Sequence, residues 1–132
     1  MQIEKTLHEE VSWRLKTLRP DCLVLPVPNQ FWIPTRTAAE RELVDRLVAR
    51  MKDDRQLVPG ISDLLVLWST GSGAIELKRP ASRNLFGRVP AGRPSPAQKD
   101  FRQDCLAHGV PHIYAESWED VRGALAAWGR LR

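Results

Sequence analysis

Three charged residues at the ends of an apolar hairpin constrain this chain more than any other feature. Residues 63–80 read DLLVLWSTGSGAIELKRP, two apolar stretches joined by a turn rich in serine and glycine. That arrangement predicts an antiparallel β-hairpin. Yet Asp63 opens the first stretch, and Glu76 and Lys78 lie in and after the second. Burying a charge is costly unless it is paired or bound, so these three residues need partners.

The geometry of β-strands predicts where the three charges point. Strands are expected over residues 64–68 and 74–77, joined by a short turn. Side chains two apart on a strand share a face at a spacing of about 6.5–7 Å, so Glu76 and Lys78 point the same way. We expect a register that pairs Asp63 with Lys78 and sets it diagonal to Glu76, about 7–8 Å away. All three side chains would then lie on one face of the sheet.

This charge pattern suits the hydrolysis of phosphodiesters. Two carboxylates that converge repel each other unless a cation lies between them. Mg²⁺ or Mn²⁺ takes oxygen ligands and keeps waters for the substrate side. A lysine beside the carboxylates holds a phosphate or orients the attacking water. The alternative is a solvated sheet face on which Lys78 bridges Asp63 or Glu76 and nothing is catalysed.

Periodicity and capping signals along the rest of the chain predict an α/β fold. With 132 residues, the chain fits one domain, residues 1–132. Ser95 and Ser117 each stand where an N-cap opens a helix. Residues 81–94 are expected to form a loop. The order is α-β-α-β-β-α-β-α, which a mixed central sheet flanked by helices accommodates. Helices are expected over residues 3–18, about 37–53, 95–108 and 117–131, and further strands over residues 22–27 and 110–115.

Composition and charge indicate which partners and which cellular compartment to expect. Lysine and arginine total 20 against 16 for aspartate and glutamate, a net charge of +4 that suits an anionic partner without requiring one. Cys22 and Cys105 show no pairing pattern, so we expect reduced thiols in a cytoplasmic protein. The charged start MQIEKTLHEE lacks the apolar segment of a signal peptide, and no apolar run approaches the ~20 residues of a membrane span. No membrane partner is expected.

Several motifs in order along the chain resemble one nuclease family. Asp63 lies in PGISDLL, Glu76 and Lys78 lie in GAIELK, and Gln98 lies in SPAQ at the start of a helix. A glycine turn, a strand and a helix opened by a serine follow. This succession of G-x-x-D, E-x-K and S-x-x-Q resembles the VRR-NUC family of the PD-(D/E)XK nuclease superfamily, of the stand-alone type common in phages and bacteria. The resemblance covers roughly residues 4–125, with serine in place of the proline of the motif.

The resemblance implies a restriction-endonuclease-like core and a metal-dependent endonuclease of a bacterial or phage-infected cell. It implies that Asp63 and Glu76 hold Mg²⁺ or Mn²⁺, assisted by the Leu77 carbonyl. It also implies that Lys78 positions the attacking water and that Gln98 reaches the site. Gln98 has a second interpretation, because with a serine three residues earlier it completes a capping box. DNA is the expected substrate, with branched or flapped DNA among its forms, and such relatives often pair into homodimers.

The resemblance further implies a metal-binding glutamate from the first helix, where three glutamates compete. At about 100° per residue, Glu4 lies at the centre of the apolar stripe, Glu10 at its edge and Glu9 on the opposite side. Glu4 is therefore the expected ligand, at an inward position where a carboxylate has to be neutralised or bound. The alternatives stay open: Glu10 in its place, or a frayed terminus at which Glu4 meets water.

Basic residues follow the expected active strand and suggest contacts to a nucleic-acid backbone. A basic loop beside a phosphate-cutting site is suited to clamp phosphates, although a solvated loop is the alternative. Trp32 lies in an expected loop, where it suits base stacking, and His108 and His112 are expected at turns or in solvent. The expected nucleic-acid-binding residues are Arg79, Arg83, Arg88, Arg93 and Lys99.

Two rival functions are compatible with the same fold. One is a non-catalytic nucleic-acid-binding module, and the other is a phage accessory or inhibitor module that acts through a partner. Loss of Lys78 or Glu76 would be the first sign of the non-catalytic module, and both are present together with Asp63. The complete set therefore favours a nuclease.

Overall fold

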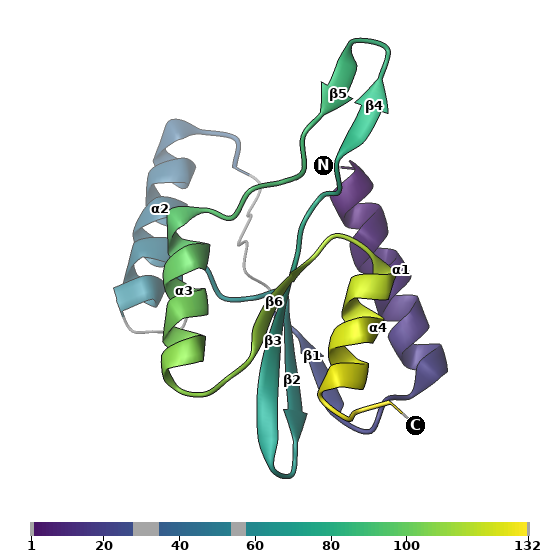
Figure 1. The fold of residues 1–132 in the computed structure, drawn as a ribbon. Coiled ribbons are helices and arrows are strands. Elements are labelled where there is room, and N and C mark those ends of the chain that lie inside the picture. The colour runs from purple at the N-terminus through teal and green to yellow at the C-terminus, as the bar shows by residue number, and fades with distance from the viewer. Residues whose placement is uncertain (1, 28–34, 54–57, 132) are drawn as a thin grey trace.

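The computed structural model describes residues 2–27, 35–53 and 58–131, and these form a mixed α/β arrangement (Figure 1). The predicted α/β class with a mixed sheet flanked by helices is confirmed. The observed order differs from the predicted one by β4 and β5, which occupy a segment expected to be a loop. The elements are α1 (Gln2–Leu18), β1 (Leu23–Pro26), α2 (Ala38–Asp53), β2 (Leu64–Trp68), β3 (Gly71–Leu77), β4 (Ser82–Asn84), β5 (Gly87–Val89), α3 (Pro96–Ala107), β6 (His112–Ala115) and α4 (Trp118–Ala127).

The larger sheet of the described residues has the strand order β1-β2-β3-β6. The pairs β1–β2 and β2–β3 are antiparallel, whereas β3 and β6 are parallel. A parallel pair needs a long crossover connection. Here the chain leaves β3, runs through the β4–β5 hairpin and α3, and returns as β6. The hairpin and α3 therefore both lie in the connection between β3 and β6.

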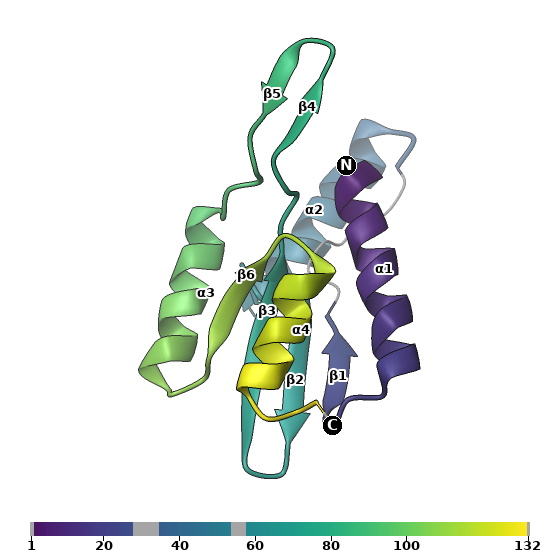
Figure 2. The same cartoon turned by 45° about the vertical axis from the view of Figure 1, so that its right-hand side comes forward.

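The core lies between one face of the sheet and the pair α1 and α4 (Figure 2). Its side chains are at most 7% exposed, and burying each large aliphatic one stabilises the fold by about 1.5–3 kcal/mol. Because Leu77 points into this core, its neighbours Glu76 and Lys78 point to the other face of the sheet. Core members include Leu7 and Val11 of α1, Val121 and Leu125 of α4, and Ile75 and Leu77 of β3.

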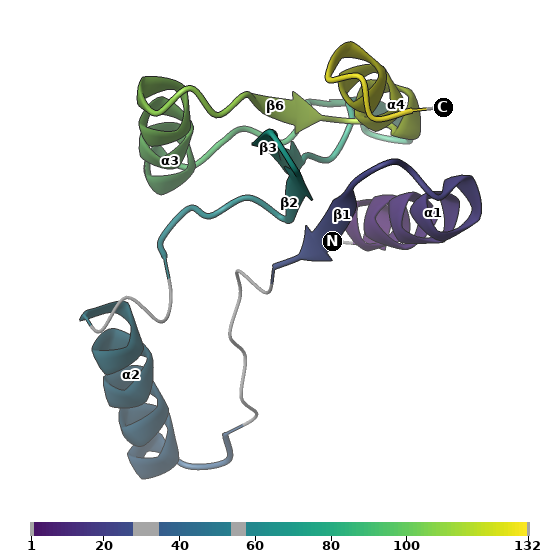
Figure 3. The same cartoon turned by 90° about the horizontal axis from the view of Figure 1, so that it is seen from below.

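The remaining helices lie away from this core. Helices α3 and α4 flank β6 on opposite sides, and α2 stands apart from the sheet (Figure 3). Thr37 caps the start of α2, since the Glu40 amide donates to Thr37 Oγ1 at 3.1 Å. Two leucines of α2 lie at the surface, with Leu43 64% and Leu47 46% exposed.

The structure also shows the state of the two cysteines and the lengths of the helices. Cys22 and Cys105 are free cysteines, as predicted, and burial raises the pKa of both thiols above the ordinary value. Over residues 2–27, 35–53 and 58–131, no helix is long and apolar enough to span a bilayer.

A β-hairpin replaces the loop predicted for residues 81–94. Strands β4 and β5 pair antiparallel, with Arg83 opposite Arg88 and Asn84 opposite Gly87. Strands of three residues are too short to show the alternation from which a sequence indicates a strand. Both Figure 1 and Figure 2 show this hairpin extending away from the sheet and its helices.

Candidate functional site

The register of β2 and β3 sets Asp63 opposite Glu76. Leu64 pairs with Ile75, and continuing this ladder by one residue places Asp63 opposite Glu76. The predicted pairing of Asp63 with Lys78 was wrong by two residues, because the turn is shorter than expected. A shift of two residues keeps every side chain on its original face. The three charged residues therefore still share one face, with Asp63 and Glu76 closer together than predicted.

Backbone amides hold both carboxylates in place. The Leu77 amide donates to Asp63 Oδ2 at 2.8 Å, and the Asp63 amide donates to Glu76 Oε2 at 3.2 Å. Each carboxylate thus accepts from the main chain of the other strand. Asp63 is 7% exposed and Glu76 2%, so little water remains to separate their charges.

Gln98 links Glu76 and Lys78 from the first turn of α3. Its Nε2 donates to Glu76 Oε1 at 2.7 Å, and its Oε1 accepts from Lys78 Nζ at 2.5 Å and from the Ser95 amide at 2.9 Å. Lys78 Nζ also lies 3.5 Å from Glu76 Oε1. The capping box is therefore confirmed, and the same side chain contacts the charged residues, whereas its role in a metal site stays a prediction.

Gly60 explains how the loop before Asp63 closes on α3. Its φ of +72° lies in the left-handed region, and a Cβ at this position would lie 2.2 Å from the backbone of Ala97. A glycine satisfies both restrictions, whereas any side chain would collide with the helix. The glycine of the G-x-x-D motif thus lets the segment carrying Asp63 approach the turn that carries Gln98.

The electrostatics of the site centre on Glu76. Burial raises its pKa from the ordinary 4.5 to about 7, the neighbouring Asp63 carboxylate adds to the rise, and Lys78 opposes it. At neutral pH, the protein therefore holds this carboxyl near its own titration point. Strongly perturbed acidic groups of this kind cluster at functional sites, although structural ion pairs also produce them.

The donor set fits a hard divalent ion that keeps part of its water. Mg²⁺ in proteins commonly binds through one or two carboxylates together with substrate phosphates. Asp63 and Glu76 supply such a pair, and a cation between them would relieve the repulsion that helps to raise the pKa of Glu76. Within the part of the chain that the structure describes, no cluster of three His, Cys, Asp or Glu side chains could hold a metal.

Of the three glutamates in α1, the structure describes the side chains of Glu9 and Glu10. Glu4 lies in α1, one helical turn before His8, and its side chain lies outside the described residues. His8 Nε2 is 3.6 Å from Asp63 Oδ1, a neighbour that the sequence did not indicate. Glu9 and Glu10 are exposed. Whether Glu4 joins the site stays a prediction.

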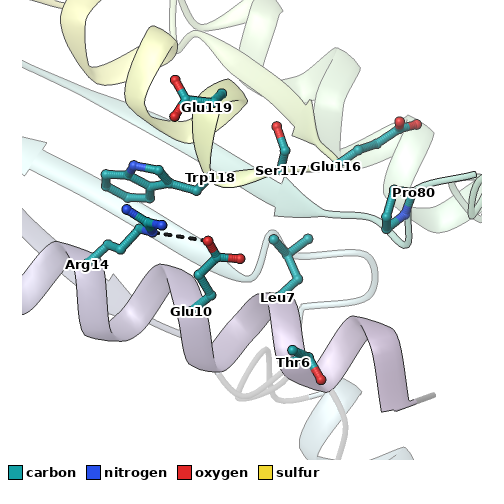
Figure 4. Close-up of a pocket in the computed structure, with 9 residues that line it drawn as sticks. All are labelled: Thr6, Leu7, Glu10, Arg14, Pro80, Glu116, Ser117, Trp118 and Glu119. Carbon is teal, nitrogen blue, oxygen red and sulfur yellow. Dashed lines mark hydrogen bonds and ion pairs between the residues drawn. The ribbon is translucent and has the colours of Figure 1, made fainter.

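Glu10 faces a separate cavity of about 530 Å³ between α1 and the start of α4 (Figure 4). Its carboxylate accepts from Arg14 Nε at 3.0 Å. The described residues that line this cavity do not include Asp63, Glu76 or Lys78, so this cavity and the charged site are different places. The lining residues are Thr6, Leu7, Glu10, Arg14, Pro80, Glu116, Ser117, Trp118 and Glu119.

A buried Ser62–His112 pair was not predicted. Ser62 Oγ lies 2.9 Å from His112 Nε2, and the two residues are 0% and 4% exposed. Burial, with Arg102 nearby, lowers the pKa of His112 to about 4, so the ring is neutral at physiological pH. The expectation of a turn or solvent position for His112 was wrong, because its ring packs at the start of β6 while Arg102 donates to its carbonyl. The pair ties the segment before Asp63 to β6.

The predicted nucleic-acid-binding residues divide between the hairpin and its base. Arg79 closes the base, since its Nη2 donates to the Pro90 carbonyl at 2.9 Å and its own carbonyl accepts from the Gly92 amide at 2.8 Å. The remaining members are exposed, on the strands of the hairpin, shortly before α3 or within α3. These are Arg83, Arg88, Arg93 and Lys99. Trp32 lies outside the described residues.

Comparisons with known proteins do not assign the chain to a family. No protein-family model, no curated protein and no solved structure matches the chain. The resemblance to VRR-NUC nucleases therefore rests on the motifs alone and stays a prediction.

Proposed function

We propose that this chain is a metal-dependent endonuclease that hydrolyses DNA phosphodiester bonds. The observation that carries the proposal is the nearly buried Glu76 carboxylate opposite Asp63, with Lys78 Nζ 3.5 Å away. Burying two acidic groups side by side lowers stability, so a function that needs them is the simplest reason for their presence. The motif resemblance supports a restriction-endonuclease-like core around this site.

Each residue of the site has a role in this proposal. Asp63 and Glu76, with the Leu77 carbonyl, hold Mg²⁺ or Mn²⁺, which offsets their charge and stabilises the charge developing on the phosphate. Lys78 points its ammonium to the same side and orients the attacking water. Gln98 fixes Lys78 and Glu76 relative to each other. Glu4 is proposed as a further ligand because of its position on the first helix.

Pairing with a second copy is part of the same proposal. The resemblance implies homodimers, and one small domain has little surface with which to grip two duplex arms. Branched or flapped DNA is the substrate form for which such pairing is useful.

A non-catalytic nucleic-acid-binding module is the second candidate, and one observation favours it. Glu76 Oε1 already lies 2.7 Å from Gln98 Nε2 and 3.5 Å from Lys78 Nζ. This network satisfies the buried charge without an ion, and the basic hairpin would bind DNA in either case. A phage accessory or inhibitor module has the same support.

Cleavage assays separate these candidates. Mn²⁺ is titrated against linear, nicked, flapped and four-way DNA, with wild type, Asp63→Asn and Glu76→Gln compared at equal fold content. The nuclease proposal expects Mn²⁺-dependent cleavage by wild type and loss of cleavage in both variants. Glu119→Gln, with 76% of its side chain exposed, is the matched control and should cleave normally. Binding without cleavage by wild type would support the non-catalytic candidate.

A further inference from the structure

The tip of the β4–β5 hairpin exposes two large apolar side chains. Leu85 and Phe86 are 99% and 97% exposed, more than any other large apolar residue described. They form a two-residue loop, because Asn84 pairs with Gly87 across the hairpin. Apolar surface that stays in water at a protruding point commonly marks an interaction site.

The chemistry of the turn does not require these residues. The Phe86 amide donates to Asn84 Oδ1 at 2.8 Å, and Gly87 takes a φ of +118°, so the flanking residues supply the local turn-forming chemistry. Loop positions of such turns ordinarily carry Gly, Asn, Asp, Pro or Ser. The hairpin itself therefore does not explain why Leu85 and Phe86 occupy its turn.

The charge on the hairpin indicates a polyanionic partner. Residues 79–94 contain four arginines and no acidic residue. Arg83 stands directly opposite Arg88, a pairing of like charges that weakens an isolated hairpin. A row of phosphates would remove that repulsion.

The base of the hairpin lies at the candidate active site. The hairpin lies in the connection between Lys78 and Gln98, with β4 beginning at Ser82 and β5 ending at Val89, and Lys78 Nζ donates to Gln98 Oε1 at 2.5 Å. The bond from the Gly92 amide to the Arg79 carbonyl closes the same base. The hairpin that carries the tip is thus connected at its base to the strand and the helix that carry Lys78 and Gln98, and it extends away from the sheet (Figure 2).

We propose that the β4–β5 hairpin is a DNA wedge: Phe86, supported by Leu85, inserts at an unstacked base step while Arg83 and Arg88 contact the flanking phosphates. The choice of DNA as the occupant rests on the proposed nuclease function. Proteins that kink or open a duplex commonly insert an apolar side chain between bases, and aromatic rings stack on exposed ones. A nick, flap or branch offers such a step at the lowest cost. The wedge thereby selects interrupted duplexes and presents the nearby strand to Asp63 and Glu76.

Binding of labelled DNA in EDTA tests the wedge apart from cleavage. A flapped duplex and a linear duplex of equal length are compared for wild type, Phe86→Ala and Leu85→Ala/Phe86→Ala. Phe86→Ala should weaken binding of the flapped duplex by about 5- to 150-fold, the range for loss of one stacked base, and leave linear duplex nearly unchanged. Phe86→Trp should retain the preference. Trp13→Ala, which removes an aromatic ring 64% exposed on α1, is the control and should change neither.

The outcomes distinguish the wedge from the nuclease. If Phe86→Ala binds and cleaves flapped DNA like wild type while Glu76→Gln fails to cleave, the wedge is wrong and the nuclease proposal stands. If wild type cleaves nothing but Phe86→Ala still loses the flap preference, the wedge stands without the nuclease. If wild type binds no DNA and instead needs Phe86 to bind phosphatidylserine-containing vesicles, the tip is a membrane contact and the wedge is overturned.

Discussion

Replacing Glu76 with Gln should stabilise the metal-free protein above neutral pH. The folded state raises the pKa of Glu76 from 4.5 to about 7, chiefly by burial and then by the Asp63 carboxylate. At 1.36 kcal/mol per pH unit, that rise corresponds to about 3 kcal/mol. The folded protein holds this proton more tightly than the unfolded chain. The free energy of unfolding therefore falls as pH rises between 4.5 and about 7, and above that the full cost of the buried charge remains.

The variant keeps part of the hydrogen bonding and loses the charge. A glutamine carbonyl can still accept from the Asp63 amide, but the contacts from Gln98 and Lys78 to the second oxygen are weakened, a loss of about 1 kcal/mol. A net gain of about 2 kcal/mol remains at about pH 8, which is roughly 5–10 °C in Tm for a chain of this size. The gain should disappear near pH 5, where wild-type Glu76 is already protonated in the folded state.

Thermal unfolding in EDTA at these two pH values measures the effect. Glu119→Gln removes an exposed carboxylate and serves as the control, with little change expected at either pH. A Glu76→Gln variant that melts at or below the wild-type temperature at the higher pH would falsify the account of a strained carboxylate. A gain of equal size at both pH values would also contradict it, because the effect could not then come from ionisation.

Three further predictions follow from the hairpin, α1 and the Gly60 contact. Gly60→Ala should lower Tm strongly and weaken cleavage, because its Cβ would lie 2.2 Å from the Ala97 backbone at a φ of +72°; a Tm equal to wild type would show that the close approach is relaxed in solution. Glu4→Gln should raise the Mn²⁺ concentration needed for half-maximal cleavage while Glu9→Gln changes nothing, and loss of cleavage in Glu10→Gln alone would show that the helix phase was assigned wrongly. Replacing Arg83, Arg88 and Arg93 together with Ala should lower the slope of log K against log salt by roughly 2–3 for every DNA sequence. An unchanged slope would show that these side chains contact no phosphate.

Local signals in the sequence predicted the elements, whereas tertiary contacts decided the register. The caps Ser95 and Ser117 opened helices as predicted, because each satisfies a backbone amide within its own turn. The glycines after Trp68 were interpreted as turn residues. Gly73 instead lies in β3, where a Cβ would come 2.6 Å from the Trp128 ring. A tryptophan 55 positions away along the chain is not a local signal, so the turn was predicted too long and the register was wrong by two residues.

Strand periodicity predicted only part of the candidate site. That Glu76 and Lys78 share a face follows from the alternation of side chains, and the structure agrees. The bonds from Gln98 to both of them, and the Ser62–His112 pair, join residues between 20 and 50 positions apart. No spacing rule indicates such contacts, because they depend on how α3 and β6 pack. The motif resemblance singled out Gln98, and nothing singled out His112.

The proposed nuclease requires that Asp63 and Glu76 form an ion site and not merely a buried network with Lys78 and Gln98. Electron paramagnetic resonance of free Mn²⁺, titrated with metal-free protein, counts the bound ions directly. The account predicts one or two Mn²⁺ per chain in wild type, displaced by excess Mg²⁺, with binding strongly weakened in both Asp63→Asn and Glu76→Gln. Wild-type protein that leaves Mn²⁺ free, or variants that bind it as tightly as wild type, would contradict the account.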